Sequence, residues 1–262
     1  MEISLSMKLD LSTQISNWIR NYAKARNKIL IIGVSGGIDS AVTSILCANT
    51  FIKTCVISIP ILQNENQLLR AREHCVYLEE KYSNVEYIEM DMTVPFLSLK
   101  TIFDRTHYNN ELGLANTKSR LRMITLYQIA SSLDGIVVGT GNKIEDFGVG
   151  FFTKYGDGGV DISPIGDLMK SEVRQLAKDL GVSQNIIDAK PTDGLWNDDR
   201  TDEDQLGITY DELEYAMCLD VLSLNENANL FNDEQQKILN VYRDHRNKNL
   251  HKMIAIPTFK KL

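Results

Sequence analysis

Residues 29–40 read Ile29-Leu-Ile-Ile-Gly-Val-Ser-Gly-Gly-Ile-Asp-Ser40. The unbroken apolar run at 29–32 is typical of a strand that is buried on both faces of a parallel sheet. It leads through a short polar turn into residues 41–46, which can continue as a helix. The stretch therefore predicts a strand, a tight turn and the start of a helix, the repeating unit of a parallel α/β sheet.

The turn has the composition of a phosphate-binding loop. Gly36 and Gly37 allow the backbone to approach a ligand closely, and the free N–H groups at a helix start attract anions. Ser35 and Ser40 add hydroxyl donors, and the carboxylate of Asp39 is a ligand that Mg²⁺ accepts. The alternative is a turn that only joins a strand to a helix, in which Asp39 caps the helix.

The spacing of residues excludes the two commonest phosphate loops. No lysine stands in the turn, as a Gly-x-x-x-x-Gly-Lys-Ser/Thr loop requires, and the glycines do not follow Gly-x-Gly-x-x-Gly. The segment Ser35–Ser40 instead resembles the pyrophosphate loop of the ATP-pyrophosphatase family, whose members cleave ATP to AMP and pyrophosphate while adenylating a substrate.

The composition limits the class of protein. The chain has 262 residues, 43% hydrophobic and 24% charged, which is the balance of a soluble globular protein. A net charge of −7 argues against a general nucleic-acid binder. No apolar run approaches the ~20 residues that span a bilayer, so we expect no membrane partner.

The cysteines and the N-terminus predict a cytoplasmic location. The four cysteines show no Cys-x-x-Cys spacing, and the expectation is buried free thiols in a reducing compartment; they are Cys47, Cys55, Cys75 and Cys218. Residues 1–8 have neither a basic start nor a long apolar core, so no signal peptide is expected.

Strand-like and helix-like segments alternate along the first half of the chain. An amphipathic helix is expected at 9–25, and a helix is also expected at 67–82. Further strands are expected at 53–60, 84–90 and 135–140. This order predicts an α/β protein with a doubly wound parallel sheet flanked by helices, a Rossmann-like three-layer fold. Ligands of such sheets lie beyond the carboxyl ends of the strands, so the loops Ser35–Ser40 and Thr140–Glu145 should meet at one site.

A helix expected at 114–132 carries cations in its first turns, where they oppose the helix dipole; with one amide they are Asn116, Lys118, Arg120 and Arg122. This misfit favours an external anion as their partner, although a solvated charged face is the alternative. Residues 141–164 contain six glycines among aromatic residues and carboxylates, which predicts an ordered loop around a substrate.

The C-terminal half is expected to be mainly helical. A helix should begin at Lys170 and end at Gly181, followed by closing helices at 209–219 and 233–249. The acidic stretch 197–205 is expected to be a mobile loop whose carboxylates are solvated, not metal ligands.

Together these segments resemble the ammonia-dependent NAD synthetase family over most of the chain, from Ser35 to Pro257. The motifs that carry the resemblance are Ser35–Ser40, Asn116–Arg120, Phe151–Asp161, Pro191-Thr192, Leu206–Asp211 and His251-Lys252. The first motif marks only the superfamily, whereas Phe151-Phe-Thr-Lys-Tyr-Gly-Asp-Gly-Gly-Val-Asp161 is far more selective.

The resemblance implies an adenine nucleotide alpha hydrolase-like fold, with residues 1–262 forming a single domain. It implies that ATP adenylates the carboxylate of nicotinic acid adenine dinucleotide (deamido-NAD), releasing pyrophosphate, and that ammonia displaces AMP to give NAD. It also implies Mg²⁺ as cofactor and a homodimer with substrate sites at the subunit interface. We expect the terminal helices to supply the dimer contacts. No glutaminase domain is expected, so the nitrogen donor should be ammonia, either free or supplied by a separate partner.

Residue roles follow from the matching positions. The resemblance places ATP on Gly33, Val34, Ser35, Gly36, Gly37, Ile38, Asp39, Ser40, Thr140, Lys170 and Thr192. It places magnesium on Asp39 and Glu145, and deamido-NAD on Asn116, Arg120, Lys154, Asp161, His251 and Lys252. The catalytic residues are then Asp39, Lys170 and Asp161, with Asp161 expected to hold ammonium and take its proton.

Two departures and several alternatives accompany this interpretation. Residues 59–66 match the family only loosely and receive no role, and the residues between Thr140 and Glu145 differ from the commonest version. The alternative for Asp161 is a residue that only pairs with Lys154 or Arg120, and the alternative for Lys170 is a surface lysine. The rival functions are another adenylating ligase, such as a tRNA-thiolating enzyme, and a non-catalytic ATP-binding module.

Overall fold

The structure is a computed structural model that describes residues 10–196, 198, 200–225 and 231–261. In this part of the chain four parallel strands form one sheet in the order β3-β2-β1-β4. They are β1 (Ile29–Gly33), β2 (Thr54–Ser58), β3 (Val85–Glu89) and β4 (Gly135–Val138). The four predicted strands are thus confirmed: β1 extends one residue beyond the predicted run 29–32, and the other three are shorter than predicted by two or three residues.

The strand order explains where a ligand can bind. From β1 the chain winds outward through β2 to β3, and β4 then returns to the other side of β1. Ile31 pairs with Cys55 of β2 on one side and with Val137 of β4 on the other. The loops that leave β1 and β4 therefore diverge at the point where the winding reverses, which is where open α/β sheets bind ligands.

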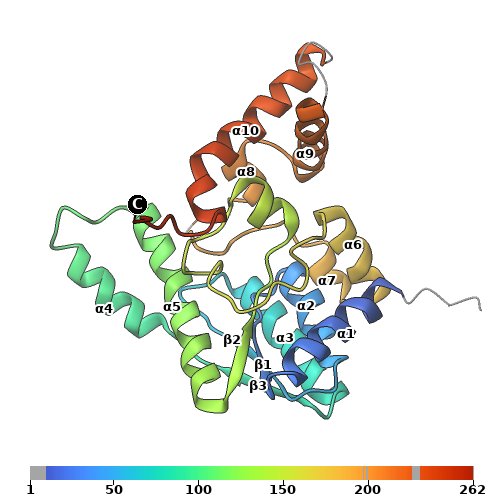
Figure 1. Ribbon diagram of the computed structural model, residues 1–262. Helices are drawn as coiled ribbons and strands as arrows, with labels where there is room; N and C mark the ends of the chain where they lie inside the picture. Colours follow the sequence, from blue (N-terminus) through green and yellow to red (C-terminus); the bar gives the residue numbers. More distant parts are fainter. Residues whose placement is uncertain (1–9, 197, 199, 226–230, 262) are drawn as a thin grey trace, which may run out of the picture.

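Helices cover both faces of the sheet, which gives three layers (Figure 1). Because side chains alternate along β1, Leu30 and Ile32 face one layer and Ile31 faces the other. The first layer holds α1 (Leu11–Lys24), α2 (Ile38–Ala48), α3 (Glu65–Lys81), α6 (Lys170–Asp179) and α7 (Gln184–Ile187). The long helix α5 (Glu111–Leu133) covers the opposite face. The predicted doubly wound, three-layer fold is confirmed.

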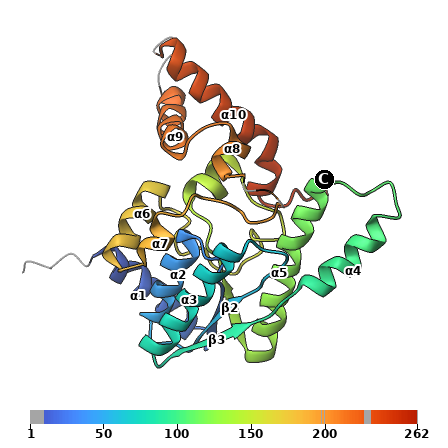
Figure 2. The same cartoon turned by 180° about the vertical axis from the view of Figure 1, so that it is seen from behind.

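A second hydrophobic cluster lies beyond the carboxyl ends of the strands, where the C-terminal helices stand apart from the sheet in both views (Figures 1 and 2). It is built on the fully buried Tyr210 and Tyr242. Its elements are the π-helix η1 (Lys143–Val149) and the helices α8 (Asp202–Leu206), α9 (Tyr210–Asn225) and α10 (Asp233–Met253).

Some sequence expectations need correction. Helix α4 (Thr93–Phe103) was not expected. Only Phe96 of this helix is buried, and its other apolar residues do not form a buried face that a periodic pattern would reveal. Helix α5 begins at Glu111, capped by Asn110, instead of at 114. The cations at 118–122 therefore lie in its third turn and beyond, where opposition to the helix dipole is weak.

Three of the cysteines, Cys47, Cys55 and Cys75, are buried free thiols as predicted, whereas Cys218 is exposed. None of the described helices is long and apolar enough to cross a membrane.

Candidate active site

A cavity opens at the reversal point of the sheet, between the loops that follow β1 and β4. The residues predicted to bind ATP and magnesium all line it. These are Gly33, Val34, Ser35, Gly36, Gly37, Ile38, Asp39, Ser40, Thr140, Glu145, Lys170 and Thr192. Segments far apart in sequence thus meet at one site, as the strand order requires.

Serine hydroxyls and a close helix contact hold the Ser35–Ser40 loop in shape. The hydroxyl of Ser40 donates to the carbonyl of Gly37 at 2.9 Å and accepts from the Ser35 N–H at 3.2 Å. Gly36 has φ of +84°, and a Cβ there would lie 2.4 Å from the carbonyl oxygen of Gln67 on α3. Gly37 opens α2 without a side-chain cap, so the first N–H groups of this helix remain available to an anion at the cavity.

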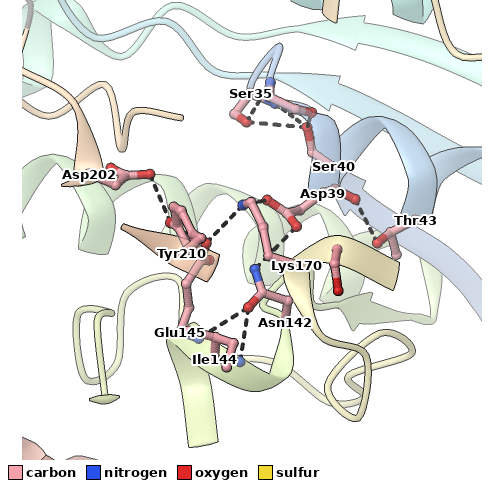
Figure 3. Close-up of polar contacts among 12 residues, drawn as sticks. Ser35, Asp39, Ser40, Thr43, Asn142, Ile144, Glu145, Lys170, Asp202 and Tyr210 are labelled. Atoms are coloured by element: carbon pink, nitrogen blue, oxygen red, sulfur yellow. Dashed lines mark hydrogen bonds and ion pairs between the residues drawn. The ribbon is translucent and has the colours of Figure 1, made fainter. Parts of the chain in front are cut away.

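Lys170 joins the two strand-end loops (Figure 3). Its ammonium lies 2.6 Å from Oδ2 of Asp39, which follows β1, and 2.9 Å from Oε1 of Glu145, which follows β4. The lysine side chain is only 2% exposed, and each carboxylate side chain is 17% exposed. The surface-lysine alternative is therefore excluded, and the positive charge missing from the loop comes from the first residue of α6.

Burial and pairing oppose one another in this ion cluster. Burial alone would lower the pKa of Lys170, but the charges of Asp39 and Glu145 together raise it above its ordinary value. Burial would raise the pKa of Glu145, yet Lys170 and Tyr210 hold it below its ordinary value. For Asp39, desolvation outweighs the attraction of Lys170 and raises the pKa. A protonated Lys170 and an ionised Glu145 follow from these directions.

Asn142 orients both carboxylates. It is fully buried, and its side-chain oxygen caps η1 by accepting from the N–H groups of Ile144 and Glu145 at 3.1 Å. Its amide donates to Oδ1 of Asp39 at 3.2 Å. The Asn142 side chain therefore holds the first turn of η1, which carries Glu145, and also the carboxylate of Asp39. Asn142 was not predicted as a site residue, because a lone amide in a loop carries no recognisable sequence pattern.

The C-terminal helices reach the cluster through Tyr210. Its hydroxyl donates to Oε1 of Glu145 at 2.7 Å and lies 3.2 Å from Oδ2 of Asp202. Asp202 is 6% exposed and lines the cavity. The prediction that the acidic stretch 197–205 is a loop of solvated carboxylates is therefore wrong at this residue, because helix α8 turns Asp202 inward; residues 197 and 199 lie outside the described residues.

Further residues line the cavity: Arg122, one of the cations expected to face an anion, and the carboxylates Asp146 and Asp157, which received no role from the sequence. Arg122 donates from Nε to the carbonyl of Ile59, and burial lowers its pKa to about 10. Asp157, inside the glycine-aromatic segment, accepts from the hydroxyl of Ser119 at 2.6 Å and the N–H of Thr153 at 3.0 Å. Burial raises the pKa of Asp157, and that of the neighbouring cavity residue Asp146.

The residues predicted for deamido-NAD gather outside the lining of this cavity, where α5, the 151–161 segment and the end of α10 meet. Arg120 donates to the carbonyl of Lys154, and Lys154 donates to the carbonyl of His251 at 2.7 Å. Lys252 donates to the carbonyl of Phe152 at 2.7 Å, and Asn116 accepts from Thr153. Their charges are therefore held together by backbone oxygens and not by carboxylates.

Asp161 stands apart from this group. Its carboxylate accepts from the N–H of Val137 at 2.7 Å and from the hydroxyl of Tyr127 at 3.3 Å, and it does not line the cavity. No hydrogen bond joins it to Lys154 or Arg120 among the described contacts. The residue ties the glycine-aromatic segment to β4, and this position gives no support to its predicted role in proton transfer from ammonium.

The donor set fits magnesium to a limited degree. Asp39 and Glu145 face the same ammonium, so their oxygens are close enough to share a cation. Among the described residues no group of three His, Cys, Asp or Glu side chains forms a protein-only metal site. Mg²⁺ commonly takes one or two carboxylates and completes its shell with phosphate oxygens and water, and the two carboxylates match that habit.

Sequence comparison decides the family. The model of the NAD synthase family matches residues 11–260. The chain belongs to the NAD synthase family. An NH₃-dependent NAD synthetase of Carboxydothermus hydrogenoformans is 39% identical over 208 residues, covering 78% of this chain and 83% of that protein. One of Archaeoglobus fulgidus is 36% identical over 225 residues, covering 85% and 86%.

Solved structures show the same NAD synthase fold. An NMN synthetase of Francisella tularensis superposes with a TM-score of 0.82 at 31% identity, covering 96% of this chain and 98% of that one. The NH₃-dependent NAD synthetase of Campylobacter jejuni gives a TM-score of 0.76 at 22% identity, covering 97% and 100%. The family resemblance drawn from the motifs is thus confirmed, and the tRNA-thiolating and non-catalytic alternatives are not favoured.

Proposed function

We propose that this NAD synthase family member amidates deamido-NAD with ammonia at the expense of ATP, giving NAD, AMP and pyrophosphate. The observation that carries the proposal is the buried contact of Lys170 with Asp39 and Glu145 at the end of the Ser35–Ser40 loop. A loop that merely links a strand to a helix does not require a buried cation and two carboxylates beside its glycines.

The cavity residues suit adenylation. Free N–H groups at the start of α2 and the hydroxyls of Ser35 and Ser40 would bind the leaving pyrophosphate. Lys170 and Thr192 would hold phosphate oxygens, and Thr140 would contact the adenosine end. The carboxylate oxygen of deamido-NAD would attack the α-phosphorus of ATP. The bond between the α-phosphorus and the leaving pyrophosphate would break, and the acyl-adenylate would form. Positioning and charge neutralisation supply most of the rate enhancement in such a step.

We also propose magnesium as the cofactor. Asp39 and Glu145 are the residues that would hold it, and when bound it would neutralise charge on the phosphate oxygens. Lys170 already contacts both carboxylates in the structure, so it holds them in place before the nucleotide enters.

In the second half-reaction ammonia attacks the acyl carbonyl and AMP leaves. We propose that Asn116, Arg120, Lys154, His251 and Lys252 bind the anionic dinucleotide, since four of these are cations or potential cations gathered on a protein of net charge −7. Asp161 remains a candidate contact of the dinucleotide. We expect ammonia, and not glutamine, to be the nitrogen donor.

The direct test is product analysis. We expect the protein, incubated with ATP, Mg²⁺, deamido-NAD and ammonium, to form NAD, AMP and pyrophosphate in equal amounts. Each product should depend on the dinucleotide, and EDTA should abolish all three. Formation of ADP, or pyrophosphate release without the dinucleotide, would contradict the proposal.

A second substrate is favoured by one comparison. The Francisella tularensis protein, 98% of whose chain is covered by the match, is an NMN synthetase. We therefore propose nicotinic acid mononucleotide as the alternative acceptor of the amide. The ratio of kcat/KM for the two acids, measured in the same assay, decides between them: a dinucleotide enzyme prefers deamido-NAD by at least about tenfold, equivalent to about 1.4 kcal/mol.

Three further proposals concern the whole protein. Residues 1–262 act as one domain, supported by the contact of Tyr210 in the C-terminal cluster with Glu145 beside the sheet. The chain forms a homodimer in the cytoplasm. Exposed apolar residues support dimerisation: Trp18 on α1 is 48% exposed, and Val94 and Ile102 on α4 are 73% and 59% exposed. Light scattering of the wild type and of Ile102→Glu tests the dimer.

A further inference from the structure

One carboxylate oxygen at the cavity has no partner. Oδ1 of Asp202 is the single buried side-chain oxygen or nitrogen that makes no hydrogen bond among the residues that the structure describes. The side chain is 6% exposed, so water from the surface does not satisfy it. Buried polar atoms in native proteins almost always have partners, and an isolated exception points to a missing ion, ligand or water.

The position of Asp202 is fixed by its own helix and not by chance. Thr201 caps α8 in a reciprocal pair with Asp204, whose carboxylate accepts from the Thr201 N–H at 2.8 Å. The N–H of Asp202 donates to the carbonyl of Pro191 at 3.0 Å. The backbone on both sides is therefore anchored, and the side chain is directed into the cavity beside Thr192, a proposed phosphate ligand.

The second carboxylate oxygen of Asp202, Oδ2, has only a weak hydrogen-bond donor in Tyr210. A phenol carries one proton, and the Tyr210 hydroxyl lies 2.7 Å from Glu145 but 3.2 Å from Oδ2 of Asp202. The shorter contact takes the proton. Asp202 in its charged form thus lacks a good donor on either oxygen, and burial, followed by the charge of Glu145, raises its pKa to about 7.

The chemistry of the incoming substrate decides what the oxygen binds. The triphosphate of ATP offers acceptors only, and its charge repels an ionised carboxylate, so it is not a partner of Oδ1 in the charged form of Asp202. Asp39, Glu145 and Asp202 together carry three carboxylates against one buried ammonium, that of Lys170. A divalent cation that enters with the nucleotide would balance the excess negative charge, and the cation or its bound water would give Oδ1 a partner.

We propose that Asp202 is an outer-shell ligand of the magnesium that accompanies ATP, with Oδ1 accepting a hydrogen bond from a water bound to the ion; this agrees with the absence of a group of three direct side-chain ligands among the described residues. The inference rests on the proposed ATP-dependent function. It assigns a metal-binding role to the acidic segment, which the sequence pattern suggests is solvated.

The test measures metal binding, not turnover. Mn²⁺ is titrated into the protein with a non-hydrolysable ATP analogue and followed by electron paramagnetic resonance. We expect Asp202→Asn, which preserves the shape of the side chain, to weaken Mn²⁺ binding at least tenfold. Asp198→Asn is the matched control, because its carboxylate is 54% exposed and pairs with Arg200; it should bind Mn²⁺ as the wild type does.

Stability without ligands separates a ligand from a structural residue. Since Asp202 is buried without donors, Asp202→Asn should raise the melting temperature of the free protein. Unchanged Mn²⁺ affinity in a folded Asp202→Asn would overturn the proposal, whatever the melting temperature. If the variant does not fold, a crystal structure of the wild type with Mn²⁺ and the analogue decides: an Mn²⁺-bound water hydrogen-bonded to Oδ1 supports the proposal, and a site without this contact contradicts it. A wild type that binds no nucleotide refutes the proposed function instead.

Discussion

The ammonium of Lys170 and the carboxylate of Asp39 form a buried ion pair at 2.6 Å, although 131 residues separate them in sequence. Glu145 completes the cluster at 2.9 Å. A buried charge that loses its partner is strongly destabilising, because the remaining charge keeps its desolvation penalty. The pair therefore links the stability of the fold to the chemistry of the site.

Lys170→Met should lose roughly 3–5 kcal/mol of unfolding free energy, because it leaves two buried carboxylates without a cation. Adenylation should fall by about 10²-fold or more, as one group that stabilises phosphate charge is removed. Urea unfolding and pyrophosphate release provide the two measurements. Mg²⁺ alone should also stabilise Lys170→Met more than the wild type, since the ion no longer competes with an ammonium.

Lys143→Met is the matched control for the lysine variant. Lys143 pairs with Asp167 at 2.8 Å, but the Asp167 side chain is 95% exposed. We expect this change to alter stability by less than about 1 kcal/mol, since solvent screens exposed pairs. Equal losses in the two variants would show that the Lys170 cluster contributes no special stability.

Gly36→Ala should disrupt the loop that connects β1 to α2. The residue has φ of +84°, and a Cβ would meet the backbone of α3 at 2.4 Å. Gly181→Ala is the control, because Gly181 has φ of +72° with nothing within 4 Å of a Cβ. The control should cost about 1 kcal/mol from strain alone, whereas Gly36→Ala should cost roughly 3 kcal/mol and abolish ATP binding measured by calorimetry. Similar losses would mean that the close approach of α3 is unimportant.

Features encoded by neighbouring residues were predictable from the sequence. The strands are short apolar runs, and the Ser35–Ser40 loop is a compact pattern of glycines and hydroxyls, so both the sheet and the phosphate end of the site were predicted. The site for Lys170 was assigned through the family resemblance, because no local pattern distinguishes a buried lysine at a helix start from an exposed one.

Features that depend on distant packing were not predictable in the same way. Tyr210 contacts Glu145 across 65 residues, and only the packing of α9 against η1 brings them together. Asp202 sits in a run of charged residues that has the composition of a solvated loop, and its burial arises from α8. The helix α4 escaped prediction because its apolar residues Val94 and Ile102 face solvent.

Asp161→Asn tests whether the position of this carboxylate in the structure excludes a role with ammonia. The hydrogen bond from the N–H of Val137 weakens when one carboxylate oxygen becomes an amide, so we expect a stability loss of about 1 kcal/mol. The rate at saturating ammonium should stay close to that of the wild type across pH. Asp157→Asn changes a carboxylate that does line the cavity and should lower this rate. A large, pH-dependent rate loss in Asp161→Asn alone would restore the predicted ammonium role.

His74 predicts how stability falls in acid. It is 4% exposed beneath α2, its Nε2 lies 2.9 Å from the hydroxyl of Ser44, and burial lowers its pKa to about 4 from the model-compound value of 6.5. Nε2 of His74 and the Ser44 hydroxyl share one hydrogen bond, which a neutral imidazole ring satisfies as donor or as acceptor. The unfolded chain binds a proton below pH 6.5 while the folded chain does not. The stabilisation is therefore complete above pH 6.5 and is lost as the pH falls toward 4, by about 3 kcal/mol in total. His74→Gln keeps a hydrogen-bonding group for Ser44 but has no imidazole to protonate. Its urea midpoint should therefore fall less between pH 6.5 and 4 than that of the wild type. The control His107→Gln changes an exposed residue and should follow the wild type. A parallel decline in all three proteins would assign the acid sensitivity to other groups.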